Sequence, residues 1–170
     1  KLAHQIETDS TNRVLVATRG ASSSDGDPNE IYGTSASSQA QTNIYWFDYD
    51  GSTEATTINT ITTTERVVAL TVDQFDNLYY IDVQSILHKL VKSSNYTEDF
   101  TSPFPIDLKA APYNIGPTAT WRVNDFAINF HNQAFFILAT NTSSTVVPRI
   151  TRIECDGTLY TSTNPTNPVT

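Results

Sequence analysis

Acidic residues are the first candidates for chemistry, because two of them have the spacing of a calcium-binding loop. Residues 48–52 read DYDGS, in which Asp48 and Asp50 match the first two ligand positions of such a loop. No glutamate follows at the twelfth position, where a bidentate ligand normally completes the site. The turn containing Asp25 and Asp27 is an equally incomplete oxygen cluster. We therefore interpret both segments as solvated turns and expect no metal and no other cofactor.

The histidines and the cysteine form no pattern that supports catalysis. His4, His88 and His131 are far apart in the sequence and show none of the paired spacings of a zinc site. Cys155 lies between two acidic residues, which disfavour the thiolate that a nucleophile requires, and we expect a small buried side chain within a strand. The sequence also contains no nucleophile-elbow, phosphate-loop or dinucleotide motif. We therefore expect the protein not to be an enzyme.

Aromatic side chains are the remaining candidates for a binding surface. Tyr45 and Trp46 belong to a dense aromatic run, and Trp121 opens the last of the three repeat units described below. An outward-facing Trp or Tyr at these positions could stack on a glycan or on a neighbouring subunit. We favour the alternative that these rings pack between sheets, because one face of a strand is expected to belong to the core and large aromatic side chains fill the space between sheets.

Two glycosylation sequons indicate an extracellular protein. They place candidate glycans on Asn95 and Asn141, in segments that we expect to be surface turns. The chain has no methionine at position 1 or elsewhere, which is consistent with removal of a leading segment. Its composition is rich in uncharged Thr, Ser and Asn, as is typical of secreted surfaces. We therefore expect a secreted protein.

Length and charge limit the classes of partner. The 170 residues suit one domain, and 38% hydrophobic residues are enough for a packed core. The net charge of −8, without a cluster of Lys or Arg, disfavours nucleic acid and anionic membrane surfaces. No run is long and apolar enough to predict a membrane span.

An internal repeat organises the elements that must position these residues. Three runs each contain an apolar approach, an Asp or Asn, a polar turn and a second β-rich run: 6–18 IETDSTNRVLVAT, 70–82 LTVDQFDNLYYID and 126–138 FAINFHNQAFFIL. The alignment makes Asp9, Asp73 and Asn129 equivalent. A side chain of this kind can accept hydrogen bonds from the backbone of its own turn, which favours a tight hairpin.

A second shared block follows each run. These blocks read 44–52 IYWFDYDGS, 86–94 ILHKLVKSS and 150–158 ITRIECDGT, and a Thr-rich or short β-prone tail follows each one. Each unit is therefore predicted to hold four antiparallel strands. We expect a single all-β domain over 1–162, with units at about 1–62, 65–101 and 121–162 and inserts at 20–41 and 102–120. Residues 163–170 are expected to form an extended Pro-, Thr- and Asn-containing tail.

This pattern resembles the blades of NHL/SMP-30-like β-propellers. The closest match is 72–82, which reads VDQFDNLYYID, an inner strand ending in Asp followed by a Leu-Tyr second strand. The resemblance implies an array of about three four-stranded blades, with a two-sheet β-sandwich as the alternative fold. It also implies an alternative function as part of a sugar-lactone hydrolase, whose cation is held by Glu, Asn and Asp. Only Asn124 and Asp125 match that ligand set here.

The number of units leads to the functional hypothesis. A closed propeller needs typically four to eight blades, so three would leave sheet faces and strand edges uncovered. We therefore expect a non-enzymatic structural or adhesive module that self-associates with other copies of itself into an oligomer or an extracellular fibre. A glycan-binding propeller is a further alternative.

Overall fold

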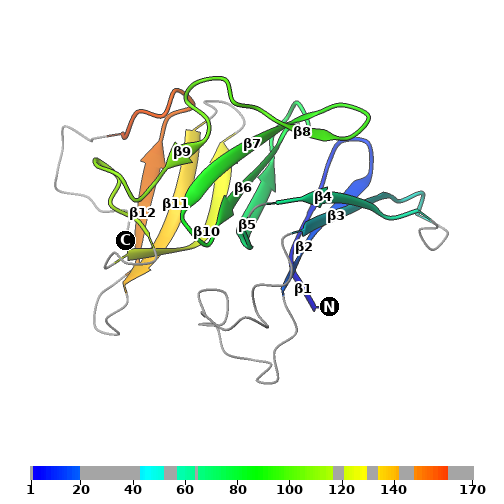
Figure 1. The fold of residues 1–170 in the computed structure, drawn as a ribbon, viewed down its shortest axis with the longest axis horizontal. Coiled ribbons are helices and arrows are strands. Elements are labelled where there is room, and N and C mark those ends of the chain that lie inside the picture. Colours follow the sequence, from blue (N-terminus) through cyan, green and yellow to red (C-terminus); the bar gives the residue numbers. More distant parts are fainter. Residues whose placement is uncertain are drawn as a thin grey trace.

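In the part of the chain that the structure describes, three antiparallel sheets follow one another in sequence. The computed structural model describes residues 2–19, 43–51, 57–63, 65–116, 121–129, 134–141 and 148–160. Within these ranges all regular structure is β-strand, which confirms the all-β prediction, and no helix is long and apolar enough to span a bilayer. Sheet 2 lies between sheet 1 and sheet 3 (Figure 1). The predicted insert at 20–41 and the tail at 163–170 lie outside the described residues.

Sheet 1 is a four-stranded meander. Its strands, in spatial and chain order, are β1 (Leu2–Thr8), β2 (Arg13–Arg19), β3 (Asn43–Asp48) and β4 (Asn59–Thr62). In β3 the buried residues alternate with half-buried ones, because one face of the sheet packs against sheet 2 and the other does not.

Sheet 2 has the same order of strands and is covered on both faces. Its strands are β5 (Val67–Val72), β6 (Leu78–Asp82), β7 (Ile86–Lys92) and β8 (Tyr96–Glu98), and a short β9 (Ile106–Asp107) pairs with the start of β7. Every residue of β5 and β6 is buried. A strand buried on both sides carries apolar residues almost continuously, as the run VVALTV of β5 does.

Sheet 3 has three strands in the described part of the chain, where four were expected. They are β10 (Trp121–Asn129), β11 (Ala134–Asn141) and β12 (Arg149–Ile153). After β12 the chain turns and pairs only at a single bridge between Ile153 and Leu159. The tail after the third unit therefore does not extend the sheet within residues up to 160.

The segment expected as an insert at 102–120 is instead part of the core as far as it is described. It contributes β9, and its Leu108 and Ile115 are fully buried. The Leu108 N–H donates to the carbonyl of Ser85 (3.0 Å), and the Ile115 N–H donates to the carbonyl of Leu108 (2.8 Å). These hydrogen bonds hold the segment across the end of sheet 2 next to sheet 3.

Two predicted hairpin turns are confirmed and share one geometry. Asp9 Oδ1 accepts hydrogen bonds from the N–H groups of Thr11 (2.8 Å) and Arg13 (2.9 Å). Asp73 Oδ1 accepts the equivalent bonds from Phe75 (2.8 Å) and Asn77 (2.9 Å). In each turn the fourth residue is left-handed, with φ of 64° at Asn12 and 65° at Asp76. The turn predicted after Asn129 continues into residues that lie outside the described ranges.

A bulge in the first strand of every sheet aligns the three units. The register shifts between Ala3 and Gln5, between Val67 and Ala69, and between Val123 and Asp125. Just after the bulge, Ala69 pairs with Ile81, and Asp125 pairs with Leu138. The aligned sequence runs instead match Ile81 to Ile137, so that alignment is wrong by one residue in β11, because the third hairpin is one residue longer.

The corrected register assigns two equivalent faces to every sheet. Face A holds Ile6, Val14, Val16 and Phe47 in sheet 1; Leu70, Leu78, Tyr80 and Leu90 in sheet 2; and Phe126, Phe135, Ile137 and Ile153 in sheet 3. Face B holds Leu15, Ala17, Ile44 and Trp46 in sheet 1; Tyr79, Ile81, Leu87 and Lys89 in sheet 2; and Phe136, Leu138, Ile150 and Arg152 in sheet 3.

Both hydrophobic clusters form where a face B meets the face A of the next sheet. One cluster joins face B of sheet 1 to face A of sheet 2. The other joins face B of sheet 2 to face A of sheet 3 and includes the buried residues of 104–115. The first strands also meet, because β5 contacts β1 and β10. The contact of face B of one sheet with face A of the following sheet is therefore made twice within the chain.

Candidate functional site

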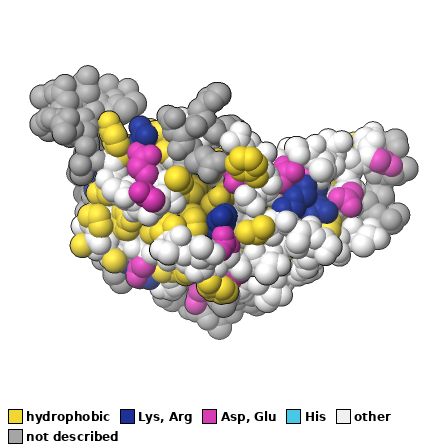
Figure 2. Space-filling view, turned by 90° about the horizontal axis from the view of Figure 1, so that it is seen from above, with side chains coloured by type: hydrophobic (Ala, Val, Ile, Leu, Met, Phe, Trp, Pro, Cys, Tyr) yellow, Lys and Arg dark blue, Asp and Glu magenta, His cyan; other side chains and the backbone are white. Residues whose placement is uncertain are grey.

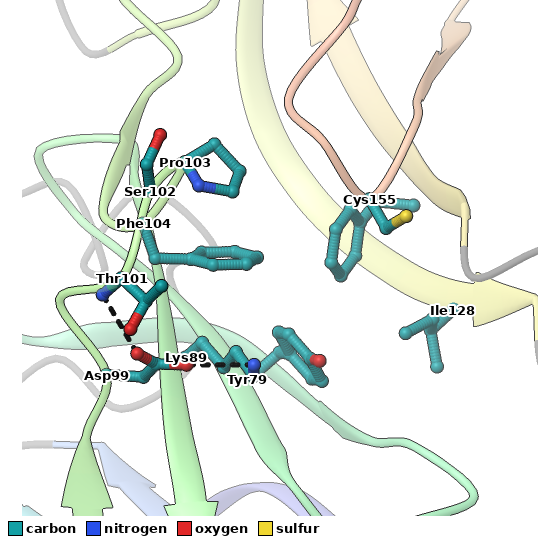
Figure 3. A pocket seen from close by; sticks show the side chains of 10 residues that line it. Tyr79, Lys89, Asp99, Thr101, Ser102, Pro103, Phe104, Ile128 and Cys155 are labelled. Atoms are coloured by element: carbon teal, nitrogen blue, oxygen red, sulfur yellow. Dashed lines mark hydrogen bonds and ion pairs between the residues drawn. The ribbon is translucent and has the colours of Figure 1, made fainter.

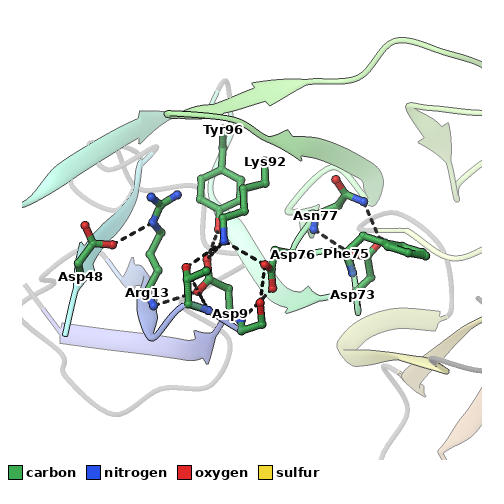
Figure 4. A network of polar contacts seen from close by, with 11 residues as sticks. Asp9, Arg13, Asp48, Asp73, Phe75, Asp76, Asn77, Lys92 and Tyr96 are labelled. Atoms are coloured by element: carbon green, nitrogen blue, oxygen red, sulfur yellow. Dashed lines mark hydrogen bonds and ion pairs between the residues drawn. The ribbon is translucent and has the colours of Figure 1, made fainter. Parts of the chain in front are cut away.

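An ion-pair network joins the hairpin ends of sheets 1 and 2 (Figure 4). Lys92 Nζ at the end of β7 lies 2.8 Å from Asp9 Oδ2 and 3.0 Å from Asp76 Oδ2. Lys92 also donates to Thr11 Oγ1 (2.9 Å), and Ser10 donates through its N–H (2.8 Å) and its hydroxyl (2.7 Å) to the carboxylate of Asp76. The two turns predicted from the repeat therefore hold not only their own hairpins but also one sheet against the next.

The network keeps its members charged. Burial alone would raise the pKa of Asp9, but hydrogen bonds from Lys92, Thr11 and Arg13 lower that pKa to about 2. Burial alone would lower the pKa of Lys92, but its hydrogen bonds to Asp9 and Asp76 raise that pKa. A fully charged, hydrogen-bonded pair of this kind is typical of a structural contact, since a nucleophilic lysine needs a depressed pKa.

Trp46 packs beside this network and is not available at the surface. It is 5% exposed and meets Tyr96 edge to face, with 6.3 Å between ring centroids. The guanidinium of Arg13 lies 3.8 Å from the centre of the indole, and Trp46 Nε1 donates to Asn95 Oδ1 (3.1 Å). Of the two interpretations of this tryptophan, the structure therefore supports packing between sheets.

A second polar group lies within the same interface between sheets 1 and 2. His88 is buried and stacks on Tyr80, with 4.4 Å between ring centroids. Its Nδ1 lies 2.6 Å from Glu98 Oε1 and its Nε2 lies 3.2 Å from Asp82 Oδ2. Burial alone would lower the pKa of His88, but hydrogen bonds and charge from Asp82 and Glu98 raise it. The ring is therefore held between two carboxylates, as a protonated bridge would be.

A cavity of about 290 Å³ lies between sheets 2 and 3 (Figure 3). Its apolar wall is aromatic, with Tyr79 5.1 Å from Phe135 and 5.8 Å from Phe104 between ring centroids. Its polar side holds Lys89 Nζ, which lies 2.8 Å from Asp99 Oδ2. Hydrogen bonds from Lys89 and from the segment after Asp99 lower the pKa of Asp99 to about 2. Lys89 and Asp99, the two charged residues that line the cavity, therefore form an ion pair with each other.

Cys155 borders this cavity, and its position contradicts the one predicted from the sequence. It is an exposed free cysteine in the turn after β12, not a buried residue within a strand. The turn forms because the Glu154 N–H donates to the carbonyl of Thr158 (2.9 Å) and the Gly157 N–H donates to the carbonyl of Glu154 (2.9 Å), with Gly157 left-handed at φ 85°. The strand therefore ends at Ile153, two residues before the cysteine.

The ligand pair implied by the propeller resemblance lies at the bulge of β10. Asn124 and Asp125 are exposed there; Asn124 Oδ1 accepts from Thr140 Oγ1 (3.0 Å) and Asp125 Oδ1 accepts from the Phe126 N–H (2.9 Å). Burial, with the charge of Asp125 as a second cause, raises the pKa of Glu7. Among the residues that the structure describes, no group of three or more His, Cys, Asp or Glu side chains has an arrangement that could hold a metal ion.

The other predicted site residues lie at several places on the fold. Tyr45 is half-buried on the face A side of sheet 1, where Asn43 Nδ2 donates to its hydroxyl (3.3 Å). Asn95 is exposed in the turn before β8, and its Oδ1 also accepts from the Tyr96 N–H (2.9 Å). Trp121 begins β10 and Asn141 ends β11, but their side chains lie outside the described part. Glycosylation of the two sequons stays a prediction.

Several charged side chains at the surface lie beside a charge of the opposite sign. On the face shown in Figure 2, dark blue groups of Lys and Arg border magenta Asp and Glu, and hydrophobic side chains gather toward the side of sheet 3. The ion pairs in the described part of the chain include Lys89 with Asp99 and Arg152 with Glu154, each at 2.8 Å. Apolar side chains are thus concentrated on one half of this face, and uncharged polar side chains and backbone cover much of the other half.

Comparison with known proteins adds no relative. No protein-family model matches the sequence, and no curated protein matches it either. The likeness to NHL/SMP-30-like blades consequently stays a prediction from the repeat, and the functional argument depends on the geometry described above.

Proposed function

We propose that this chain is a non-enzymatic, blade-like β-repeat module that works by associating with other copies of itself. The support for a blade-like array is the order of the sheets. Three meanders follow one another, β5 contacts both β1 and β10, and each contact between sheets joins a face B to the next face A. A module of this kind repeats one packing contact and can add sheets at either end.

The observation that carries the proposal is the contrast between covered and uncovered sheet faces. Sheet 2 is buried on both sides, whereas face A of sheet 1 and face B of sheet 3 are only partly covered. On these end faces Ile6 is 59% exposed and Ile150 is 52% exposed, and their other apolar members are half-buried. Apolar sheet faces at the two ends of an array favour association, since burial removes them from water.

The test is the mass of the protein in solution as a function of concentration, by sedimentation velocity or light scattering. The 18.8 kDa chain is expected to form larger species as concentration rises. Ile6→Asp places a charge on face A of sheet 1 and should shift the protein toward monomer. Phe75→Asp is the matched control, because Phe75 is comparably exposed (63%) but lies on a hairpin turn outside both faces.

A monomer at all concentrations would contradict the proposal. Equal effects of Ile6→Asp and Phe75→Asp would also contradict it, because they would show that the sheet face has no special role. A monomer that holds a divalent cation tightly would instead favour the lactone-hydrolase alternative.

A further inference from the structure

We propose that face B of sheet 3 in one copy packs onto face A of sheet 1 in a second copy. This inference rests on the proposed self-association and adds the surfaces that meet. It makes the contact between copies a third instance of the contact that the chain already makes twice within itself.

Face A of sheet 1 corresponds, by register, to the faces of sheets 2 and 3 that are covered by the preceding sheet. Residues at its register positions in sheets 2 and 3 are buried against the preceding sheet: Leu78, Tyr80 and Leu90 in sheet 2, and Phe135, Ile137 and Ile153 in sheet 3. The corresponding residues of sheet 1 are Val14, Val16 and Phe47, which are apolar yet only half-buried. Sheet 1 therefore keeps the apolar residues of this interface, but no sheet in the described part of the chain covers them.

Face B of sheet 3 has the complementary position. The equivalent residues of sheets 1 and 2 cover the sheet that follows, and they are all buried: Leu15, Ala17 and Ile44 in sheet 1, and Tyr79, Ile81 and Leu87 in sheet 2. In sheet 3 the corresponding residues are Phe136, Leu138 and Ile150, which are half-buried or exposed. Face B of sheet 3 is thus the kind of surface that would cover face A of sheet 1.

Charges on the two faces are compatible with this contact. The four residues that define face A of sheet 1 are uncharged. On face B of sheet 3, Arg152 Nε lies 2.8 Å from Glu154 Oε1, so its charge has a partner that can accompany it into an interface. Asp125 lies on the same side at the edge of the sheet, where its carboxylate accepts a backbone hydrogen bond.

A second copy also brings the number of sheets into the range that a closed propeller needs. Two copies hold six sheets, which is within the four to eight of closed propellers. If each copy covers the exposed end of the other, neither of the two end faces stays open. Because the contact joins two different surfaces, a rotation that does not close would instead produce a filament.

The internal contact predicts which residues meet across the copies. Within the chain, Tyr79 of face B lies 5.1 Å from Phe135 of face A between ring centroids. By register, Phe136 corresponds to Tyr79 and Val14 corresponds to Phe135. Phe136 of one copy is therefore expected to lie against Val14 of the other.

The experiment is crosslinking between two single-cysteine variants in a Cys155→Ser background. Val14→Cys and Phe136→Cys are prepared separately, mixed, and treated with a short bis-maleimide. The mixture is expected to yield covalent dimer several-fold above that of either variant alone, because only unlike faces meet. Val91→Cys is the matched control, since Val91 is exposed (41%) and lies on face B of sheet 2, outside the two end faces that are expected to meet. Its mixture with Phe136→Cys should yield no excess.

Different failures identify different errors. A self-associating protein whose crosslinks are equal in the mixture, the single variants and the control would overturn the face pairing and leave self-association intact. A monomer would overturn both. Long polymers that keep the selective crosslink would retain the pairing and overturn closure by two copies. Ile6→Cys with Ile150→Cys repeats the test at the most exposed residues of the two faces if Phe136→Cys does not fold.

Discussion

The two interfaces of sheet 2 contain similar apolar layers but are closed at their ends in different ways. Between sheets 1 and 2, the ion-pair network of Lys92 and the ring of Trp46 close the hairpin end. Between sheets 2 and 3, the chain segment at 99–116 closes the end and leaves a cavity beside Phe104. One repeated packing contact can therefore be completed either by side-chain charges or by inserted backbone.

The two closures depend on different physical terms. The charged closure depends on protonation, because each carboxylate must stay ionised for the network to hold. The inserted segment depends on shape and on hydrogen bonds to backbone carbonyls. The Tyr113 hydroxyl donates to the carbonyl of Gly157, and the Arg149 guanidinium donates to the carbonyl of Tyr113 (3.3 Å). Substitutions should therefore separate the two interfaces by their response to pH.

The largest expected effect is at the charged closure. Asp9→Ala removes the hydrogen bonds of its turn and one carboxylate of the ion-pair network, and should lower the free energy of unfolding by about 2–4 kcal/mol. The wild-type contribution is present above the ordinary pKa of 3.8 and is lost as pH falls through about 2, because the folded-state pKa is depressed. Chemical denaturation of both proteins at neutral and acidic pH measures the difference.

Asp73→Ala is the matched control for Asp9→Ala. Asp73 forms the same turn and accepts from the Tyr79 hydroxyl (3.1 Å), but within the described part of the chain it forms no ion pair with Lys92. Its substitution should cost about 1–2 kcal/mol. Equal losses for the two variants would show that the network contributes nothing beyond the turn.

A smaller effect is expected where the inserted segment meets the hairpin after β12. Gly157→Ala and Gly51→Ala both place a side chain at a left-handed residue, with φ of 85° and 84°, which costs roughly 1–2 kcal/mol each. At Gly157 the added Cβ would also lie 3.0 Å from Pro103 Cβ, whereas at Gly51 nothing lies within 4 Å. Thermal unfolding should therefore show the lower midpoint for Gly157→Ala. Equal midpoints for the two variants would show that the segment containing Pro103 moves away from the added Cβ with no loss of stability.

The smallest effect is a pH dependence within the interface between sheets 1 and 2. The pKa of His88 is raised in the folded state by Asp82 and Glu98, despite burial, so its stabilising contribution is complete below the ordinary pKa of 6.5. That contribution is lost as pH rises through the raised folded-state pKa. Wild-type stability should decline over this interval, and His88→Gln should flatten the decline. A parallel decline in both proteins would assign it to another group.

Local features of the fold were predictable, because they depend on neighbouring residues. Asp9 and Asp73 accept hydrogen bonds from N–H groups two and four positions onward, so the sequence spacing alone indicates these turns. The strand order of each meander follows from short connections in the same way. The third hairpin was misaligned by one residue because a longer turn leaves the hydrophobic pattern of β11 almost unchanged.

The candidate site was not predictable, because it joins residues far apart in the chain. Lys92 meets Asp9 only when sheets 1 and 2 are packed, and no sequence pattern marked Lys92. The sequence predicts Cys155 inside a strand, but the turn that begins at Glu154 places it at the surface, where it borders the cavity between sheets 2 and 3. Periodicity shows that a residue alternates with its neighbours, but not which distant surface it will meet.

Propensity, alternation and hydrogen bonds within a few residues were enough to specify an all-β chain of repeated meanders and the turns that join their first two strands. The packing of the sheets specified the rest: the direction of each face, the two ways in which the interfaces of sheet 2 are closed, and the faces that stay uncovered at the ends. This division arises because burial is a property of packed sheets and not of single strands. Val14 and Leu78 occupy the same register position, and Leu78 belongs to the core only because sheet 1 covers it.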